Sequence, residues 1–407
     1  TGSAGADTLI ATSGFAGTDS IAGGEGADTF SIRPAGAAAD VTVGALNSSS
    51  AAVFSGFQTL DMRSADGGVG TATDFTVDMD HVPSVTTINM RTADTDTKTV
   101  FTLNDLSAAQ AGALTMLHTG TDADTDSEVI VDMKTNGTDT VVMGATISAN
   151  TQVVEVNDAN NNIENLTLTV NGAFNSNVDV DVSSFSTNLT VSGGAAATTM
   201  ALANTHTNGT IDLSGVASNT TLTVGGTEQT IKGGTGKDTL TLAATLTKGD
   251  VIDLGAGATD TLSISNASLT TVNGLSNTLA STLAGNINNV ERLTVSDAVT
   301  QGINMADFSG VNFLTLAASI NGSQTVSNMT NGSTVVVSVT PAGATTDIMT
   351  LSTSGAATGT ADSITVKYDA SGNVDYGVVA LSGYETITIN ATEATAAAAL
   401  RVATIDT

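Results

Sequence analysis

The chain has 407 residues, of which 40 are Asp or Glu and 11 are Lys or Arg, giving a formal net charge of −29. Because nucleic-acid binding needs clustered Lys and Arg, this balance argues against a nucleic-acid partner and favours divalent cations. Aromatic residues make up 3% of the chain, Cys and Trp are absent, and 40% of residues are hydrophobic. Such a composition is too apolar for a disordered chain and too poor in large side chains for a thick core, so it favours a slim β protein.

The N-terminal segment contains three glycine-rich turns that each end in an aspartate. The clearest copy, residues 23–30, has Gly at its first, second and fourth positions and Asp28 at its sixth; weaker copies end at Asp7 and Asp19. Gly adopts positive φ readily, so such a turn curls tightly and directs several carbonyl oxygens toward one point. Calcium takes about six to eight oxygen ligands, more than one turn provides, so the pattern predicts stacked turns that share each ion.

The same pattern recurs in the second half of the chain. Residues 233–240 form another full copy with Asp238, and residues 254–262 form a degenerate copy with one extra residue before Asp260. A single glycine-rich turn that ends in Asp is often an ordinary β-turn. Repetition favours the calcium interpretation over that alternative.

A quieter repeat begins at Gly56, Asn162, Asn289 and Gly383, at intervals of 106, 127 and 94 residues. Each copy reads turn residue, apolar residue, Glu or Gln, any residue, apolar, any residue, apolar. The Glu or Gln is either a calcium ligand or a turn-stabilising acceptor for a backbone N–H, and we interpret it as the structural acceptor. The recurrence predicts regularly placed coils in a long array.

Short runs rich in Val, Ile and Thr, separated by Gly, Asn, Asp or Ser, predict β-strands. They cover residues 127–133, 166–170, 177–182, 221–224, 333–339 and 363–368. Helical spacing with a cap at Asn104 or Asp105 predicts one helix over residues 104–117, and the Ala-rich residues 392–400 suggest a second. We expect a first glycine-rich coil over 1–32, a β-rich array over 33–230, a second glycine-rich segment over 231–264 and a C-terminal β-rich array over 265–407.

Alternating acids occur once more, at Asp122, Asp124 and Asp126. They resemble the opening of an EF-hand loop, but Ser127 stands at the sixth position, where Gly is needed, and Met133 at the twelfth, where Glu is needed. The full EF-hand therefore fails. Two interpretations stay open: acids on one face of an extended segment that share a calcium ion, or a solvated acidic turn.

Residue types argue against an enzyme. The three His residues are scattered, and neither a His-Glu-x-x-His helix nor a Gly-x-Ser-x-Gly elbow is present. Paired acids are plentiful, but catalytic carboxylates that act on sugars normally come with aromatic platforms, and the chain has no Trp and three Tyr. We predict a protein without catalytic residues.

The glycine-rich turns match the Gly-Gly-x-Gly-x-Asp-x-apolar pattern of RTX calcium-binding repeats. Together with the acidic, Cys-free, Thr-, Ala-, Gly- and Asn-rich composition and the Gly-apolar-Glu repeat, they resemble bacterial RTX-type surface-layer proteins, such as those of caulobacters. The resemblance implies an all-β fold, an elongated parallel β-solenoid or β-roll with RTX turns and slim β-sandwich units. It also implies Ca²⁺ as the cofactor.

In the RTX family that the chain resembles, two nonapeptides make one coil, and each ion lies between turns on the same edge. The resemblance implies that Asp7 and Asp28 share one ion with main-chain oxygens, whereas Asp19 lacks a partner turn. The metal-site residues carried over in this way are Gly2, Ala4, Asp7, Gly14, Ala16, Asp19, Gly23, Glu25, Asp28, Gly233, Thr235, Asp238 and Asp260. Asp122, Asp124 and Asp126 are added from their alternation alone.

The expected function is that of an extracellular structural protein, secreted by a type I route, which self-assembles into a calcium-dependent surface layer on a bacterial cell. Its expected partners are other copies of itself and a cell-surface polysaccharide or lipopolysaccharide. We expect no membrane span, because no apolar run approaches about 18 residues. The alternatives are a segment of an RTX adhesin or biofilm matrix protein, and a β-helical polysaccharide lyase or epimerase with RTX modules.

Overall fold

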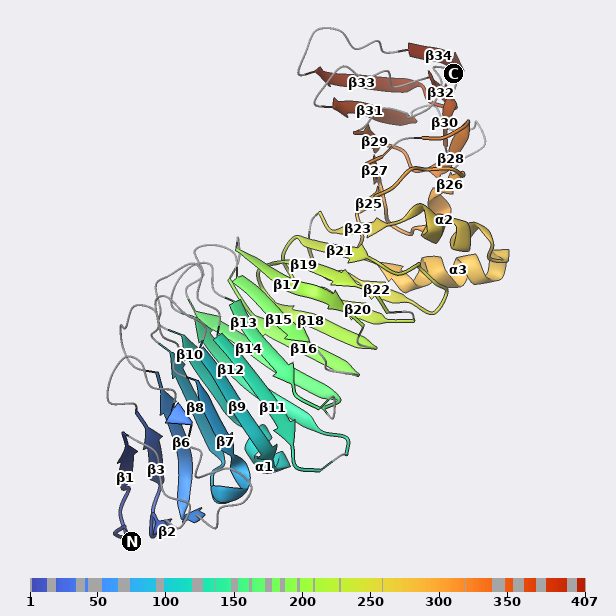
Figure 1. The fold of residues 1–407 in the computed structure, drawn as a ribbon. Helices are drawn as coiled ribbons and strands as arrows, with labels where there is room; N and C mark the ends of the chain where they lie inside the picture. Colours follow the sequence, from blue (N-terminus) through green and yellow to red (C-terminus); the bar gives the residue numbers. More distant parts are fainter. Residues whose placement is uncertain are drawn as a thin grey trace. The chain divides into compact units, whose positions relative to one another are not determined.

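The computed structural model describes residues 2–12, 20–33, 41–42, 53–64, 74–92, 99–118, 127–135, 137–147, 153–160, 163–172, 178–183, 187–195, 198–207, 209–226, 228–257, 259–318, 320–338, 348–353, 362–370, 378–393 and 401–406. The chain divides into two compact units, Thr1–Thr220 and Thr221–Thr407. Within each unit, parallel strands stack coil upon coil (Figure 1). The predicted all-β parallel solenoid is therefore confirmed.

In the first unit, successive strands of the chain alternate between two parallel sheets. The first sheet has the order β1 (Thr8–Ala11), β3 (Asp28–Ile32), β6 (Phe57–Arg63), β8 (Thr87–Thr92), β10 (Leu114–His118), β12 (Thr140–Ile147), β14 (Asn165–Gly172), β16 (Asn188–Gly193) and β18 (Thr210–Val216). The second has the order β4 (Val41–Thr42), β7 (Phe75–Asp78), β9 (Thr99–Leu106), β11 (Ser127–Met133), β13 (Val153–Asp158), β15 (Val178–Ser183) and β17 (Thr199–His206). Two short strands, β2 (Ser20–Ala22) and β5 (Val53–Ser55), pair with each other. Two single-turn helices, η2 (Met79–His81) and α1 (Ala108–Ala111), complete the described elements.

The second unit continues the same principle, and the boundary between the units falls within β19 (Asn219–Val224). One sheet has the order β19, β21 (Asp238–Leu242), β23 (Thr261–Ile264), β25 (Arg292–Val295), β27 (Phe313–Leu316), β29 (Ser333–Val337), β31 (Ser363–Ala370) and β33 (Thr386–Glu393). Facing strands are β20 (Thr230–Lys232), β22 (Val251–Asp253) and β24 (Ile287–Asn288), followed by a sheet of β26 (Ile303–Asn304), β28 (Gln324–Met329), β30 (Ile348–Thr353), β32 (Val378–Ser382) and β34 (Arg401–Asp406). Helices α2 (Asn266–Asn273) and α3 (Asn277–Asn286) lie between β23 and β24, and η3 (Met305–Asp307) follows β26.

The core is a set of ladders in which aliphatic side chains stack on their equivalents one coil away. In β14, Leu166 is buried while Thr167 is half-buried, which is the alternation of a strand with one face inward. Leu166 is the register partner of Leu189, and Leu189 is the partner of Ile211. Each such side chain contributes about 1.5–3 kcal/mol when fully buried. A thin interior of this kind needs few aromatic residues, as the composition indicated.

A short helix forms within residues 104–117, as predicted, but it is much shorter than the predicted span, and its cap is Ser107 rather than Asn104 or Asp105. β9 continues to Leu106, α1 is a single turn, and β10 begins at Leu114. Ser107 and Gln110 form a capping box, since Ser107 Oγ accepts the Gln110 N–H and Gln110 Oε1 accepts the Ser107 N–H. Pairing of β9 with β7 and β11 and of β10 with β8 and β12 supplies ladder hydrogen bonds on both sides of that turn. These contacts between coils outweigh the local helical spacing.

The second predicted helix, residues 392–400, begins inside β33, which ends at Glu393, and residues 394–400 lie outside the described part of the chain. Among the described helices, none combines the length and the hydropathy needed to cross a bilayer.

Leu189→Ala tests the ladder core. The substitution leaves a cavity between Leu166 and Ile211, and we expect the free energy of unfolding to fall by about 2–5 kcal/mol in urea titration. Thr190→Ala, on the outward side of the same strand, should change it by less than about 0.5 kcal/mol. Equal losses for the two variants would contradict this assignment of the core face.

Candidate metal centre

Glycines let the turns before β1 and β3 stack in direct backbone contact. Gly24 and Gly26 have φ of 106° and 131°, in the region that side chains with a Cβ rarely adopt. A Cβ on Gly24 would lie 2.5 Å from the carbonyl oxygen of Ser3, and one on Gly2 would lie 1.7 Å from that of Gly23. The backbones of two consecutive turns are therefore in direct contact at this corner, with no room for side chains at these glycines.

Asp7 and Asp28 occupy equivalent corners of these two coils. The backbone N–H of Asp7 donates to Asp28 Oδ1 at 2.7 Å, and the N–H of Thr29 donates to the carbonyl oxygen of Asp7 at 2.8 Å. Asp28 is fully buried, and its Oδ2 has no hydrogen-bond partner in the described part of the chain. A buried carboxylate oxygen without a partner is costly, and a cation would satisfy it.

The structure brings together the paired positions that the sequence pattern predicted. Gly2 and Gly23 line the stacked turns, whereas Ala4 and Glu25 are exposed in the same turns. The remaining N-terminal and alternating candidates lie outside the described residues: Gly14, Ala16, Asp19, Asp122, Asp124 and Asp126.

The second glycine-rich segment repeats this corner geometry. The N–H of Asp238 donates to Asp260 Oδ1 at 2.7 Å, and the N–H of Gly234 donates to Asp238 Oδ2 at 2.8 Å. A Cβ on Gly255, whose φ is 87°, would lie 2.1 Å from the carbonyl oxygen of Gly234. The degenerate copy thus stacks on the full copy despite its extra residue. Thr235 is exposed and Gly233 is buried.

In this segment, the carboxylate of Asp260 has a raised pKa. Its side chain is fully buried, and its Oδ2 has no hydrogen-bond partner among the described residues. The pKa of Asp260 is raised to about 6. Burial is the main cause, the negative charges of Asp238 and Glu291 also raise it, and the hydrogen bond from the N–H of Asp238 partly offsets these effects. At neutral pH the protein therefore holds a buried negative charge that a divalent cation would stabilise.

The Glu or Gln of the quieter repeat accepts a backbone N–H from the preceding coil in all four copies, which confirms the structural interpretation. The acceptors Gln58, Glu164, Glu291 and Glu385 lie 2.7, 2.8, 2.8 and 2.7 Å from their donor nitrogens. The donors are Asp28, Asp139, Asp260 and Asp362. Each donor stands at the start of a strand or directly before it, at the corner of its coil.

Asp139 and Asp362 are corner residues that the sequence analysis missed. Neither is preceded by the Gly-Gly-x-Gly pattern, so the motif could not reveal them. Their signal is weaker: an Asp directly before a Thr- or Ser-led strand, one coil before a Gly/Asn-apolar-Glu copy. In the structure each uses its carbonyl oxygen as well, since Asp362 O accepts from the N–H of Thr386 at 3.0 Å.

The donor set fits a hard cation only if main-chain oxygens take part. In the described ranges, no group of three or more His, Asp or Glu side chains has the arrangement of a metal site. Calcium, however, accepts backbone carbonyl oxygens as readily as carboxylates. Asp28 Oδ2, which is buried and has no hydrogen-bond partner among the described residues, and the carbonyl oxygen of Gly56 both lie within 2.8 Å of the position that a Cβ on Gly23 would take. These residues fit calcium better than a transition metal, which prefers nitrogen or sulfur ligands.

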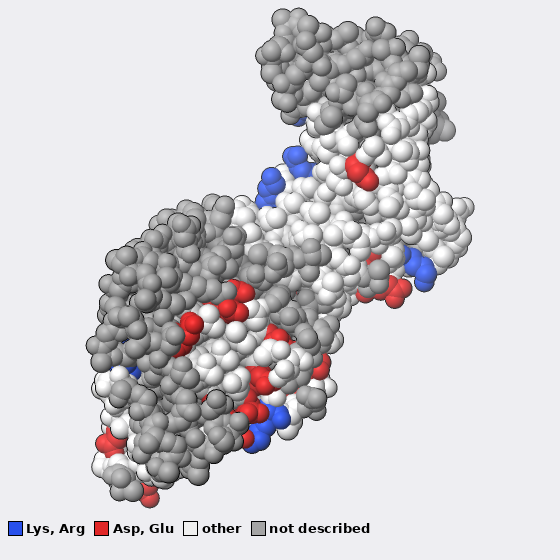
Figure 2. Space-filling model, in the orientation of Figure 1, with Lys and Arg blue, Asp and Glu red and all other residues white. Residues whose placement is uncertain are grey.

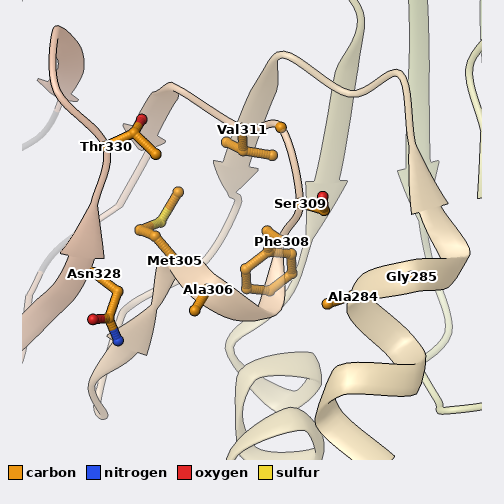
Figure 3. A pocket seen from close by; sticks show the side chains of 10 residues that line it. Ala284, Gly285, Met305, Ala306, Phe308, Ser309, Val311, Asn328 and Thr330 are labelled. Carbon is orange, nitrogen blue, oxygen red and sulfur yellow. The ribbon is translucent and has the colours of Figure 1, made fainter. Parts of the chain in front are cut away.

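An open pocket of 460 Å³ lies elsewhere in the second unit, beside α3 and η3 (Figure 3). Met305, Phe308 and Val311 form its apolar side, and Asn328 and Thr330 lie across from them. Its lining residues include no titratable side chain. The residues that line the pocket therefore provide no acidic or basic side chain.

Comparisons of the chain with protein-family models, with curated proteins and with solved structures give no match. Corner geometry and charge are therefore the features of the molecule that bear on its function.

Asp260→Asn tests the buried charge without removing the Oδ1 acceptor. Because the pKa of Asp260 is raised, the folded state binds a proton more tightly than the unfolded state, so stability falls as pH rises through about 6. In EDTA we expect the variant to melt higher than wild type at pH 7.5 and equally at pH 3.5. With millimolar calcium at pH 7.5 the order should reverse. A variant that melts lower in EDTA at pH 7.5 would contradict the buried charge.

Variants at Glu291 test the hydrogen bond by which this side chain accepts the N–H of Asp260. Glu291→Gln keeps an acceptor for the Asp260 N–H and should be nearly neutral, whereas Glu291→Ala leaves that buried donor unsatisfied and should cost about 1–3 kcal/mol in urea unfolding. Glu25→Ala, which removes an exposed carboxylate, is the control for loss of charge. If Glu291→Gln and Glu291→Ala lower the free energy of unfolding by the same amount, the hydrogen bond to the Asp260 N–H does not contribute to stability.

Proposed function

We propose that the chain is an extracellular structural protein that assembles with copies of itself into a calcium-dependent layer on a bacterial surface. The observation that supports this best is the buried Asp28 Oδ2, which has no hydrogen-bond partner among the described residues and lies near the Gly56 carbonyl oxygen of the next coil, at the corner where Asp28 Oδ1 accepts the N–H of Asp7. A ligand that binds there ties one coil to the next. The consequence is a scaffold whose rigidity depends on the ion.

Charge gives the ion a second role. A chain with a formal charge of −29 repels its own coils and its own copies. On the face of the first unit in Figure 2, acidic side chains outnumber basic ones. Bound calcium would lower this repulsion within the coil stack and between molecules. The corner exists only when the coils are stacked, so calcium binding is coupled to folding. The protein would therefore fold fully where calcium is abundant.

The chain's own residues divide the work at the corner. Gly2, Gly23 and Gly24 let the turns stack in direct contact, because a Cβ on any of them would collide with a backbone carbonyl oxygen of a neighbouring coil. Asp28 holds the register through its Oδ1, which accepts the N–H of Asp7, and keeps its Oδ2 available. The ion supplies positive charge and several coordination positions at once.

Asp28→Asn tests calcium binding at this corner. Asn keeps the Oδ1 acceptor for the Asp7 N–H but removes the anionic oxygen, so the calcium-dependent rise in melting temperature should shrink and the bound calcium per chain should fall. Glu25→Gln removes one charge from an exposed side chain of the same turn and should leave both quantities unchanged. Calorimetry and metal analysis after desalting provide the measurements. Wild-type melting that is identical with calcium and with EGTA would overturn the proposal.

Electron microscopy of the purified protein in calcium tests the assembly. Ordered two-dimensional sheets that dissolve on chelation are expected. Isolated particles that bind calcium would favour the adhesin or matrix alternative, because such a segment extends a ligand-binding tip rather than forming a lattice. Calcium-dependent cleavage of an acidic polysaccharide would favour the lyase or epimerase alternative.

A further inference from the structure

Three arginines stack on consecutive coils at one end of the first sheet. Arg63 ends β6, Arg91 lies in β8 as its register partner, and Arg33 directly follows β3. The chain has only 11 Lys and Arg residues among its 407. Three of them at one place is therefore a strong concentration of positive charge in an acidic protein.

The three arginines surround a single acid. Arg63 Nε donates to Asp61 Oδ2 at 3.0 Å, and Arg91 Nε lies 3.1 Å from Asp61 Oδ1. Arg33 reaches Asp61 Oδ2 with Nη2 at 3.7 Å, and its Nε donates at 2.9 Å to Ser31 Oγ, which itself donates to Asp61. The Asp61 side chain is 6% exposed, whereas the arginine side chains are 39–40% exposed. The carboxylate of Asp61 therefore lies buried beneath the arginine side chains, which are partly exposed to solvent.

Neutralising Asp61 does not require three arginines. One guanidinium balances one carboxylate, so the cluster keeps a formal surplus of two positive charges. Within the described part of the chain, Asp61 is the one acid at ion-pair distance from Arg33, Arg63 and Arg91. Like charges on directly opposite residues of neighbouring strands destabilise a sheet. The extra arginines therefore lower stability unless an anion binds over them.

The geometry suits an oxyanion. A guanidinium group has five N–H donors in a planar fork. Arg63 is held by the hydrogen bond from its Nε to Asp61, and the Nε of Arg91 makes an ion pair with the other oxygen of Asp61. Both arginine side chains are still 39–40% exposed, so a ligand can reach them from solvent. Fixed, half-exposed forks on adjacent strands bind carboxylate or phosphate oxygens in a bidentate manner more strongly than a mobile Lys does.

We propose that Arg33, Arg63 and Arg91 form an oxyanion-binding site whose ligand is the carboxylates of a second copy of this chain. The inference rests on the proposed self-assembly and identifies a contact that drives it. Charge complementarity favours this ligand, because each copy carries 40 Asp and Glu residues and only 11 Lys and Arg residues. Calcium lowers the repulsion without preferred orientation, whereas the arginine cluster gives the contact a direction and a register.

A charge-matched pair of double variants tests the site. Arg33→Gln with Arg63→Gln removes two positive charges but leaves Asp61 paired with Arg91. The control, Arg292→Gln with Lys367→Gln, removes two positive charges that lie over the Phe313 ring in the second unit. Sedimentation velocity in calcium should show self-association weakened about tenfold or more by the first pair, with a smaller dependence on salt. The control should change it less than about twofold, and the melting temperature of the first pair should not fall below the wild-type value, because Arg91 still pairs with Asp61 and the repulsion among the arginines is removed.

Asp61→Asn separates the site from a purely structural role. It leaves all three arginines and raises their surplus charge, so self-association should be retained or strengthened even if the melting temperature falls. Loss of association in Asp61→Asn, or wild-type association in Arg33→Gln/Arg63→Gln, would overturn the arginine site while leaving the surface-layer proposal intact.

Two further outcomes distinguish the ligand. A wild-type protein that stays monomeric in calcium would overturn the proposed assembly, and the second copy as ligand with it. Tighter binding of alginate than of poly-L-glutamate, lost in Arg33→Gln/Arg63→Gln, would assign the cluster to an acidic polysaccharide instead of a protein carboxylate. Poly-L-glutamate binding that competes with self-association is the expected result.

Discussion

The fold depends on hydrogen bonds that run along the coil stack at the corners, where strands begin. A parallel ladder pairs the N–H groups of its strands, but the N–H just before each strand needs another acceptor. Asp28 supplies it for Asp7, Asp260 for Asp238, and Glu291 for Asp260. A carboxylate is an acceptor with two oxygens and no donor, which suits a position where one N–H must be satisfied in every coil.

The same choice of residue creates the electrostatic problem of the chain. Acids that cap the corners lie above one another, and burial leaves the second oxygens of Asp28 and Asp260 without partners among the described residues. The raised pKa of Asp260 expresses this cost. Cations at the corners and arginines around Asp61 would each offset negative charge, but at different places. As we propose, a cation at a corner connects neighbouring coils of one molecule, whereas the arginine cluster connects two molecules.

Local pattern predicted the strands well and the helix badly. The run over residues 127–133 coincides with β11, because its β-branched residues favour a strand and its buried positions, which include Val129, Val131 and Met133, recur every second residue. The segment over residues 104–117 has helical spacing, yet only α1 forms, since ladder bonds to neighbouring coils are available on both sides of it. Glu164 and Glu385 show a correct prediction of role, as acceptors of a backbone N–H, made from spacing and residue type.

The sequence by itself determined the all-β class, the solenoid, the glycine corners and the acceptor role of the repeated Glu or Gln, because each is a local matter of φ, periodicity and hydrogen-bonding capacity. Tertiary structure decided which residues meet. Coils differ in length, so no fixed interval reveals that Asp139 donates to Glu164 or that Arg33, Arg63 and Arg91 converge on Asp61. Register between coils is fixed by the stacking of buried side chains, and only that register places charges from distant parts of the chain side by side.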